Sequence, residues 1–158
     1  MPDLPQNPSP VQRSIRVRQA ILEDAPRITA LDAEQTGVVK PGHFRRMLAE
    51  CRPPQGVSLV AEREGELLGY VLGEVRAWEF GSPPTGWILA VAVAPECRGE
   101  GLGAKLVSEA CRALSATGAK AVRTMVDRRS VEMLRFFRGA GFVAGPFMEM
   151  EVPCVPTA

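Results

Sequence analysis

The feature that most constrains the fold is a glycine-rich segment between an apolar run and a helical pattern. The run "WILAVAV" covers residues 87–93, and the segment "PECRGEGLGAK" covers residues 95–105. An unbroken apolar run of this length is typical of a strand buried on both faces. From Leu102 to Thr117, apolar residues recur four apart, as on one face of a helix. These patterns predict a strand, a glycine loop and a helix in succession.

The remaining patterns predict further strands and helices around this unit. Expected helices cover 24–34, 43–51 and 131–138, and expected strands cover 14–18, 57–64, 67–80, 121–126, 142 onward and 148–152. A Gly-Glu pair between 57–64 and 67–80 predicts a hairpin. The expected order is βααβββαβαββ, a mixed α+β fold.

Length and composition indicate a single domain. The chain has 158 residues, and the expected domain covers 13–153. Prolines at positions 2, 5, 8 and 10 predict a disordered tail over 1–12, and 154–158 forms a short C-terminal tail. The net charge of +1 does not favour a nucleic-acid or membrane partner. The sequence shows neither a secretory signal pattern nor the run of about 20 apolar residues that a membrane span needs. We therefore expect a cytoplasmic protein.

The cysteine and histidine content argues against a metal centre. The four cysteines form no Cys-x-x-Cys pair, and there is one histidine. Zinc sites usually combine such residues at short spacings. We therefore expect reduced, mostly buried thiols and no metal.

The glycine loop suits an anionic ligand. Glycines let a backbone approach a ligand closely, and the free N–H groups at a helix start favour a phosphate. Arg98 and Lys105 add positive charge. The loop is therefore predicted to hold a phosphate or pyrophosphate; a tight turn that caps the helix is the alternative.

A dinucleotide-binding loop also has to be weighed. "GEGLGA" fits the pattern G-x-G-x-x-A, and Asp127 ends the next strand, where a ribose-binding acid would stand. However, residues 94–98 separate the apolar run from the first glycine, and a hairpin precedes that run. The interpretation of the chain as a nicotinamide-dinucleotide enzyme thus rests on this pattern alone.

A closer match covers most of the chain. "VAVAPECRGEGLGAKLV" resembles the acyl-CoA-binding core of the GCN5-related N-acetyltransferase (GNAT) family, whose signature R/Q-x-x-G-x-G/A is given by Arg98, Gly101 and Gly103. "IRVRQAILEDAPRITAL" resembles the family's first strand and helix, and "FFRGAGF" its late helix. The resemblance implies a mixed, splayed central β-sheet flanked by about four helices, with acyl-CoA in the split.

The resemblance also implies which residues bind the cofactor. The backbone of Val91, Ala92 and Val93 would bind the pantetheine arm, and one of these amides would polarise the thioester carbonyl. The pyrophosphate would bind the amides of Arg98, Gly99, Glu100, Gly101, Leu102, Gly103 and Ala104. Asp127 stands where the family often has an asparagine that touches the cofactor, but a carboxylate cannot donate an amide hydrogen.

The residue that would protonate the departing thiolate is missing. Phe137 stands where the family often has a tyrosine for this task. Because a thiol has a pKa near ~8.5, its thiolate leaves without much help. Phe137 is expected to pack against the pantetheine or against the core.

The general base is less clear. The family often uses a glutamate on a central strand, and the run 87–93 contains no acid. Glu74 on the preceding strand is the candidate base, with a surface ion pair to Arg76 as the other interpretation. His43 is expected at a helix start in the region that covers the acceptor, and Tyr70 is expected to pack. Cys97 lacks an evident partner base for covalent catalysis.

These inferences together predict an acyl-CoA-dependent N-acyltransferase. It would move the acetyl group of acetyl-CoA to a primary amine by direct attack in a ternary complex. The acceptor, a small molecule or a protein amine, is not identified by the sequence, and a homodimer is left open. The alternative is an acyl-CoA-binding module without chemistry of its own.

Overall fold

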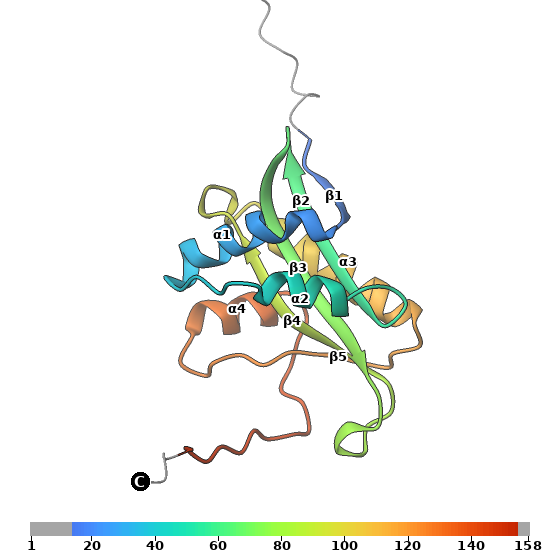
Figure 1. Ribbon diagram of the computed structural model, residues 1–158. Helices are drawn as coiled ribbons and strands as arrows, with labels where there is room; N and C mark the ends of the chain where they lie inside the picture. The colour runs from blue at the N-terminus through green and yellow to red at the C-terminus, as the bar shows by residue number, and fades with distance from the viewer. Residues whose placement is uncertain (1–13, 155–158) are drawn as a thin grey trace, which may run out of the picture.

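The computed structural model describes residues 14–154, so the expected N-terminal tail and most of the C-terminal one lie outside the described residues. Five strands form one sheet in the order β1-β2-β3-β4-β5 (Figure 1). Neighbours from β1 to β4 are antiparallel, and β5 is parallel to β4. The strands are β1 (Arg16–Gln19), β2 (Gly56–Arg63), β3 (Glu66–Arg76), β4 (Thr85–Val93) and β5 (Val122–Arg123).

Helices cover both faces of the sheet. They are α1 (Ala25–Thr36), α2 (His43–Glu50), α3 (Leu102–Ala116) and α4 (Val131–Gly139), with short 3-10 turns η2 (Leu22–Asp24), η3 (Glu79–Gly81) and η4 (Pro95–Cys97). One apolar core joins α1 and α2 to the sheet, and the other joins α3 and α4 to its opposite face (Figure 1). No helix within residues 14–154 is both long and apolar enough to cross a membrane.

The expected hairpin is confirmed. Glu64 and Gly65 connect β2 to β3 with positive φ angles of 52° and 80°. Two left-handed residues in a row match the right-handed twist of the flanking strands. This turn sets the register that pairs Arg63 with Glu66.

The sheet splits between β4 and β5. The two strands pair only at Gly86–Val122 and Trp87–Arg123. The hydroxyl of Thr124 then donates to the Ile88 carbonyl at 3.1 Å, and no further pair joins the strands. The strand expected over 121–126 is therefore only two residues long. The expected splayed, mixed sheet is present.

The two expected closing strands are absent from the described part of the chain. Residues 142–154 contain no strand, and the side chains of Val143, Met148, Met150 and Val152 are more than four-fifths exposed. Over 148–152 apolar residues alternate with glutamates, but a strand also needs a packing face or a paired edge. Pro146 also removes a backbone donor there. Two aromatic residues anchor this segment: Phe142 packs against the Phe137 ring, and Phe147 has the Arg123 guanidinium 4.5 Å from its ring centroid.

A buried ion-pair network fixes the start of α1 against the sheet. The Asp24 side chain is buried and accepts hydrogen bonds from the Arg18 guanidinium (2.8 and 3.0 Å), the Ile21 amide (2.9 Å) and Arg27. Arg18 also donates to Glu62 on β2 at 3.0 Å. Asp24 precedes α1 as expected, but its side chain serves this network and does not cap the helix.

The network also sets the pKa of Asp24. Burial by itself raises the pKa, but the bonds from Arg18, Ile21 and Arg27 outweigh it and hold the value at about 2. The ionised carboxylate is thus the form that the fold requires. Because the folded pKa is depressed, this stabilisation is complete above the unfolded value of about 3.9 and is lost as the pH falls toward 2.

We predict that Asp24→Asn lowers the free energy of unfolding at pH 7 by about 3 kcal/mol, because it leaves Arg18 without its buried partner. Urea unfolding from pH 7 to pH 2 measures the effect. The difference from the parent protein should shrink below about pH 4. Glu23→Gln, at the exposed neighbouring residue, is the control. A difference that stays constant to pH 2 would contradict the ionised network.

Candidate functional site

The open edge of β4 is the centre of the site. The Ala94 amide donates to the Leu68 carbonyl at 2.8 Å, and Tyr70 is the β3 partner of Ala92. Since hydrogen-bonded pairs alternate along an antiparallel ladder, Ala92 directs its backbone groups to β3. Val91 and Val93 direct theirs to the open edge. Of the three backbones expected to bind pantetheine, those of Val91 and Val93 are therefore the better placed.

The open edge is partly covered at one end. The Val93 carbonyl accepts hydrogen bonds from Gln35 Nε2 at 2.8 Å and from Arg98 Nε at 3.4 Å. Leu89 is 38% exposed, so β4 is not buried on both faces as the apolar run suggested. The missing strand partner is the reason, because the sheet opens beyond Ile88. Of the two residues whose backbone groups are directed to this edge, Val91 lines a cavity and Val93 does not.

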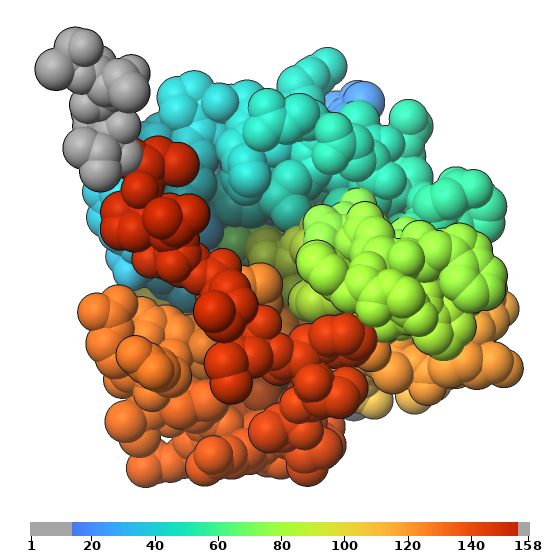
Figure 2. All heavy atoms as spheres, turned by 90° about the horizontal axis from the view of Figure 1, so that it is seen from below, coloured from blue at the N-terminus to red at the C-terminus, as the bar shows by residue number. Residues whose placement is uncertain are grey.

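That cavity has a volume of about 270 Å³ and lies between the α1–α2 segment and α4. Figure 2 shows a hollow between these two segments, with part of the C-terminal segment in front of it. Its walls combine the β4 edge with polar and aromatic side chains. They include Asp32, Lys40, His43, Tyr70, Val91 and Phe137.

The polar wall is organised by Asp32. This residue is 8% exposed. Its carboxylate accepts hydrogen bonds from Lys40 Nζ at 2.7 Å and from the Tyr70 hydroxyl at 3.3 Å. Burial, followed by the charge and hydrogen bond of Asp32, raises the pKa of Tyr70 well above its usual range. The tyrosine hydroxyl is therefore protonated at neutral pH and fixed in direction. Tyr70 does pack, as expected, but it also contributes a polar group to the cavity.

The glycines of the loop have two different tasks. Gly99 and Gly101 adopt positive φ angles of 79° and 81°, which a glycine adopts without strain. Gly103 lies inside α3, and a Cβ there would come within 2.9 Å of the Phe136 ring. Gly103 thus permits close packing of α3 on α4. The loop leads into the N-terminus of α3, whose first amides have no intrahelical partner.

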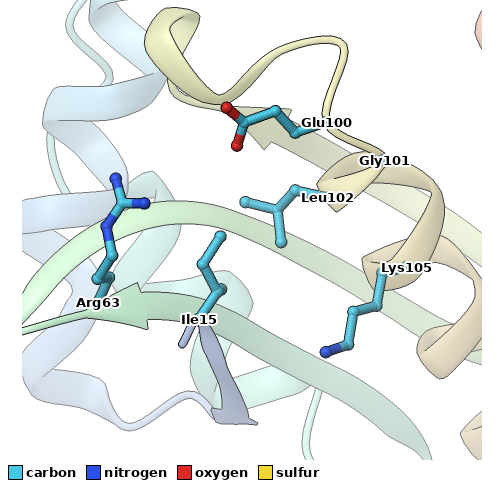
Figure 3. A pocket seen from close by; sticks show the side chains of 6 residues that line it. All are labelled: Ile15, Arg63, Glu100, Gly101, Leu102 and Lys105. Atoms are coloured by element: carbon cyan, nitrogen blue, oxygen red, sulfur yellow. The ribbon is translucent and has the colours of Figure 1, made fainter. Parts of the chain in front are cut away.

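A second cavity of about 390 Å³ lies beside this loop. Arg63 from the end of β2 and Lys105 from α3 face it, together with the carboxylate of Glu100 (Figure 3). Two cations and a helix N-terminus favour an anion here, while Glu100 opposes it. Ile15, Gly101 and Leu102 complete the lining of this cavity.

Glu74 and Asp127 are both engaged in ion pairs. Glu74 accepts from Arg76 Nε at 2.6 Å and does not line the cavity beside Val91, which favours the surface ion pair over the base. Asp127 follows β5 and binds Arg129 at 2.8 and 3.0 Å. These side-chain bonds, with the Arg129 amide, hold the pKa of Asp127 at about 2. Asp127 is thus an exposed, ion-paired carboxylate, and its contact with the cofactor stays a prediction.

Phe137 and Cys97 are both buried. Phe137 is 5% exposed, packs against Phe136 and Phe142, and also lines the cavity at the β4 edge, so both expected roles are compatible with its position. Cys97 is 1% exposed, and burial raises the pKa of its thiol. A buried, protonated thiol is a weak nucleophile. Within residues 14–154, no cluster of three or more His, Cys, Asp or Glu could hold a metal ion.

Sequence reasoning did not identify Asp32 and Lys40. A signal for Asp32 was present, because it follows Ile28 by four residues and so shares the buried face of α1. A charged residue on such a face needs a partner. The partner, Lys40, lies beyond the end of α1, and only the folded chain brings it back.

Comparison with known proteins identifies the family. The family model described as "Acetyltransferase (GNAT) family" matches residues 22–142. The chain is 28% identical over 155 residues to an L-2,4-diaminobutyric acid acetyltransferase of Nocardia farcinica, covering 91% of this chain and 78% of that protein. It is 33% identical over 110 residues to a mycothiol acetyltransferase of Paenarthrobacter aurescens, covering 70% of this chain but only 34% of that protein.

Solved structures share the fold. The aminoglycoside acetyltransferase AAC(6')-Iy, in complex with a CoA bisubstrate analogue, superposes with a TM-score of 0.75 at 14% identity and covers 89% of this chain and 99% of its own. Glucosamine-6-phosphate N-acetyltransferase from Arabidopsis thaliana gives a TM-score of 0.70 at 22% identity, covering 88% and 98%. With the family match over residues 22–142, the chain belongs to the GNAT family of acetyltransferases.

Proposed function

We propose that this protein is an N-acetyltransferase that moves the acetyl group of acetyl-CoA to a primary amine of a small acceptor. The observation that carries the proposal is the backbone of Val91 at the open edge of β4, which faces a cavity with polar side chains. An N–H group fixed in this position can stabilise the charge that develops on a thioester oxygen. The named relatives are acetyltransferases, and we extend that activity to this chain.

The donor would lie along the split between β4 and β5. Its pyrophosphate would bind amides of the glycine loop, from Arg98 to Ala104, and its pantetheine would bind the edge at Val91 and Val93. The left-handed turns at Gly99 and Gly101 support this placement, since they present the loop backbone at a helix start. Asp127 is paired with Arg129, so a contact to the cofactor there would have to use the backbone or displace Arg129.

The acceptor amine would enter the cavity between α1–α2 and α4 and attack the thioester directly. Cys97 and Cys51 are buried, and burial raises the pKa of both thiols, for Cys51 to about 11, so neither suits an acyl-enzyme. The new C–N bond forms as the C–S bond breaks. Coenzyme A leaves as a thiolate, which is stable enough to depart without a proton from Phe137.

The proton of the attacking amine needs an acceptor on the cavity wall. We place this role on His43, which begins α2 and lines the same cavity as Val91. Imidazole is the side chain that most often serves as a general base. Glu74, the base suggested by the family pattern, is bonded to Arg76.

A binding module without chemistry remains the second candidate. It is favoured by the residues at the expected acid and base positions. Phe137 stands in place of the tyrosine acid and has no proton to give, and the candidate base Glu74 is held in an ion pair. Turnover of any amine excludes this alternative.

We also propose that the protein is located in the cytoplasm.

We predict that acetyl-CoA and free CoA raise the melting temperature of the protein, whereas NADP does not. At about 100 times its dissociation constant, a ligand adds about 2.7 kcal/mol, which is roughly 5–10 °C for a chain of this size. Gly101→Val should reduce the rise, because valine strains the left-handed turn at φ 81°. Absence of any rise with either CoA species would contradict the proposed donor site.

We predict that His43→Gln lowers kcat for acetyl transfer by about 100-fold, because glutamine cannot take a proton from the amine. Glu74→Gln should change kcat by less than about threefold, as expected for a partly exposed ion pair outside the cavity. Thiol release from acetyl-CoA, followed with each variant at saturating amine, gives both values. The opposite order would return the base role to Glu74.

A further inference from the structure

The cavity contains an ion pair that the proposed chemistry does not use. Asp32 lies on α1 with 12% of its side chain exposed, and Lys40 Nζ stands 2.7 Å from its Oδ2. The Tyr70 hydroxyl donates to Oδ1 of the same carboxylate. All three residues line the cavity that the backbone of Val91 faces. A site for a cationic nitrogen therefore exists within reach of the proposed reaction centre.

The nitrogen held at this carboxylate is not suited to be the nucleophile. A carboxylate at hydrogen-bonding distance favours the charged form of an amine, whereas attack on a thioester requires the neutral form. The Tyr70 hydroxyl donates to Oδ1 and so fixes the direction of this carboxylate. A cation bound to Asp32 would stay charged while a different nitrogen reacts.

To leave this position, Lys40 has to give up one partly exposed ion pair and the contact of its Nζ with the Phe44 ring, 5.9 Å from the centroid. It lies in the connection between α1 and α2, where Gly37 and Gly42 adopt left-handed conformations on either side. Its side chain is 36% exposed, and Asp32 is its one ion-pair partner within residues 14–154. If another ammonium replaces it, Asp32 keeps a cation and Lys40 gains water. The exchange conserves the charge of the cavity and avoids an unpaired buried carboxylate.

We propose that Asp32 binds a second, non-reacting ammonium group of the acceptor, and that Lys40 occupies this subsite until the acceptor displaces it. The inference rests on the proposed function and specifies its acceptor as a molecule with two cationic nitrogens. The cavity volume of about 270 Å³ lies below the usual range for drug-sized ligands, so a short diamine, or the diamine end of a larger molecule, fits it.

Two acceptors of equal length test the subsite: 1,4-diaminobutane and 1-aminobutane, which differ by one ammonium group. The protein should acetylate the diamine with a kcat/KM at least about tenfold higher, as expected for one hydrogen bond to a charged group. About twofold of this ratio is statistical, because either end of the diamine can react. Asp32→Asn should bring the ratio down to about this factor.

Lys40→Met should change the ratio in the opposite direction. Removal of the resident ammonium leaves the carboxylate free for the acceptor, so the preference for the diamine should rise several-fold. Glu34→Gln on the exposed face of α1 and Lys120→Met at an exposed position are matched controls that should keep the parent ratio. Thermal unfolding of each variant establishes that it is folded.

A binding measurement keeps the test independent of turnover. In the presence of CoA, the diamine should raise the melting temperature more than the monoamine does, and Asp32→Asn should abolish the difference. Equal preference in the parent protein, or an unchanged ratio in Asp32→Asn, would overturn the subsite. Failure of the proposed function looks different, because acetyl-CoA would then neither stabilise the protein nor lose its acetyl group to either amine.

Discussion

The site depends on the two-residue pairing between β4 and β5. Because the strands separate after Trp87 and Arg123, the edge of β4 keeps backbone groups that a full ladder would consume. The Thr124 hydroxyl satisfies the first carbonyl beyond the pairs. The next free stretch, at Val91, faces the cavity. An incomplete sheet thus supplies hydrogen-bonding capacity where a thioester would lie.

The wall opposite this edge is held in place from a distance. Arg18 on β1 joins Asp24 at the entrance to α1 and Glu62 on β2, and so fixes the angle at which α1 crosses the sheet. Asp32 lies two turns further along the same helix, where it meets Lys40 and the Tyr70 hydroxyl. A buried structural ion pair and a cavity ion pair therefore share one rigid element, and only the second has a partner that can move away.

The glycine loop shows that similar residues can act for different reasons. Gly99 and Gly101 serve the backbone conformation, whereas Gly103 serves the contact between α3 and the Phe136 ring. The packing at Gly103 in turn keeps α4 against α3 and holds Phe137 at the cavity wall. The sequence pattern predicts three glycines near a ligand, but the structure attributes one of them to helix packing.

The sequence by itself determined the order of the first nine elements, the hairpin turn and the loop before α3. These depend on local signals: the period of apolar residues, and glycines where the backbone turns to positive φ. The alternation over 148–152 failed as a strand signal because alternation does not reveal whether a sheet edge is available. Tertiary structure alone decided where β5 leaves β4 and that Lys40 returns to Asp32, whereas the pair of Glu74 with Arg76 was one of two interpretations that the sequence left open. Each depends on side chains and strands meeting in space, which local residue patterns do not specify.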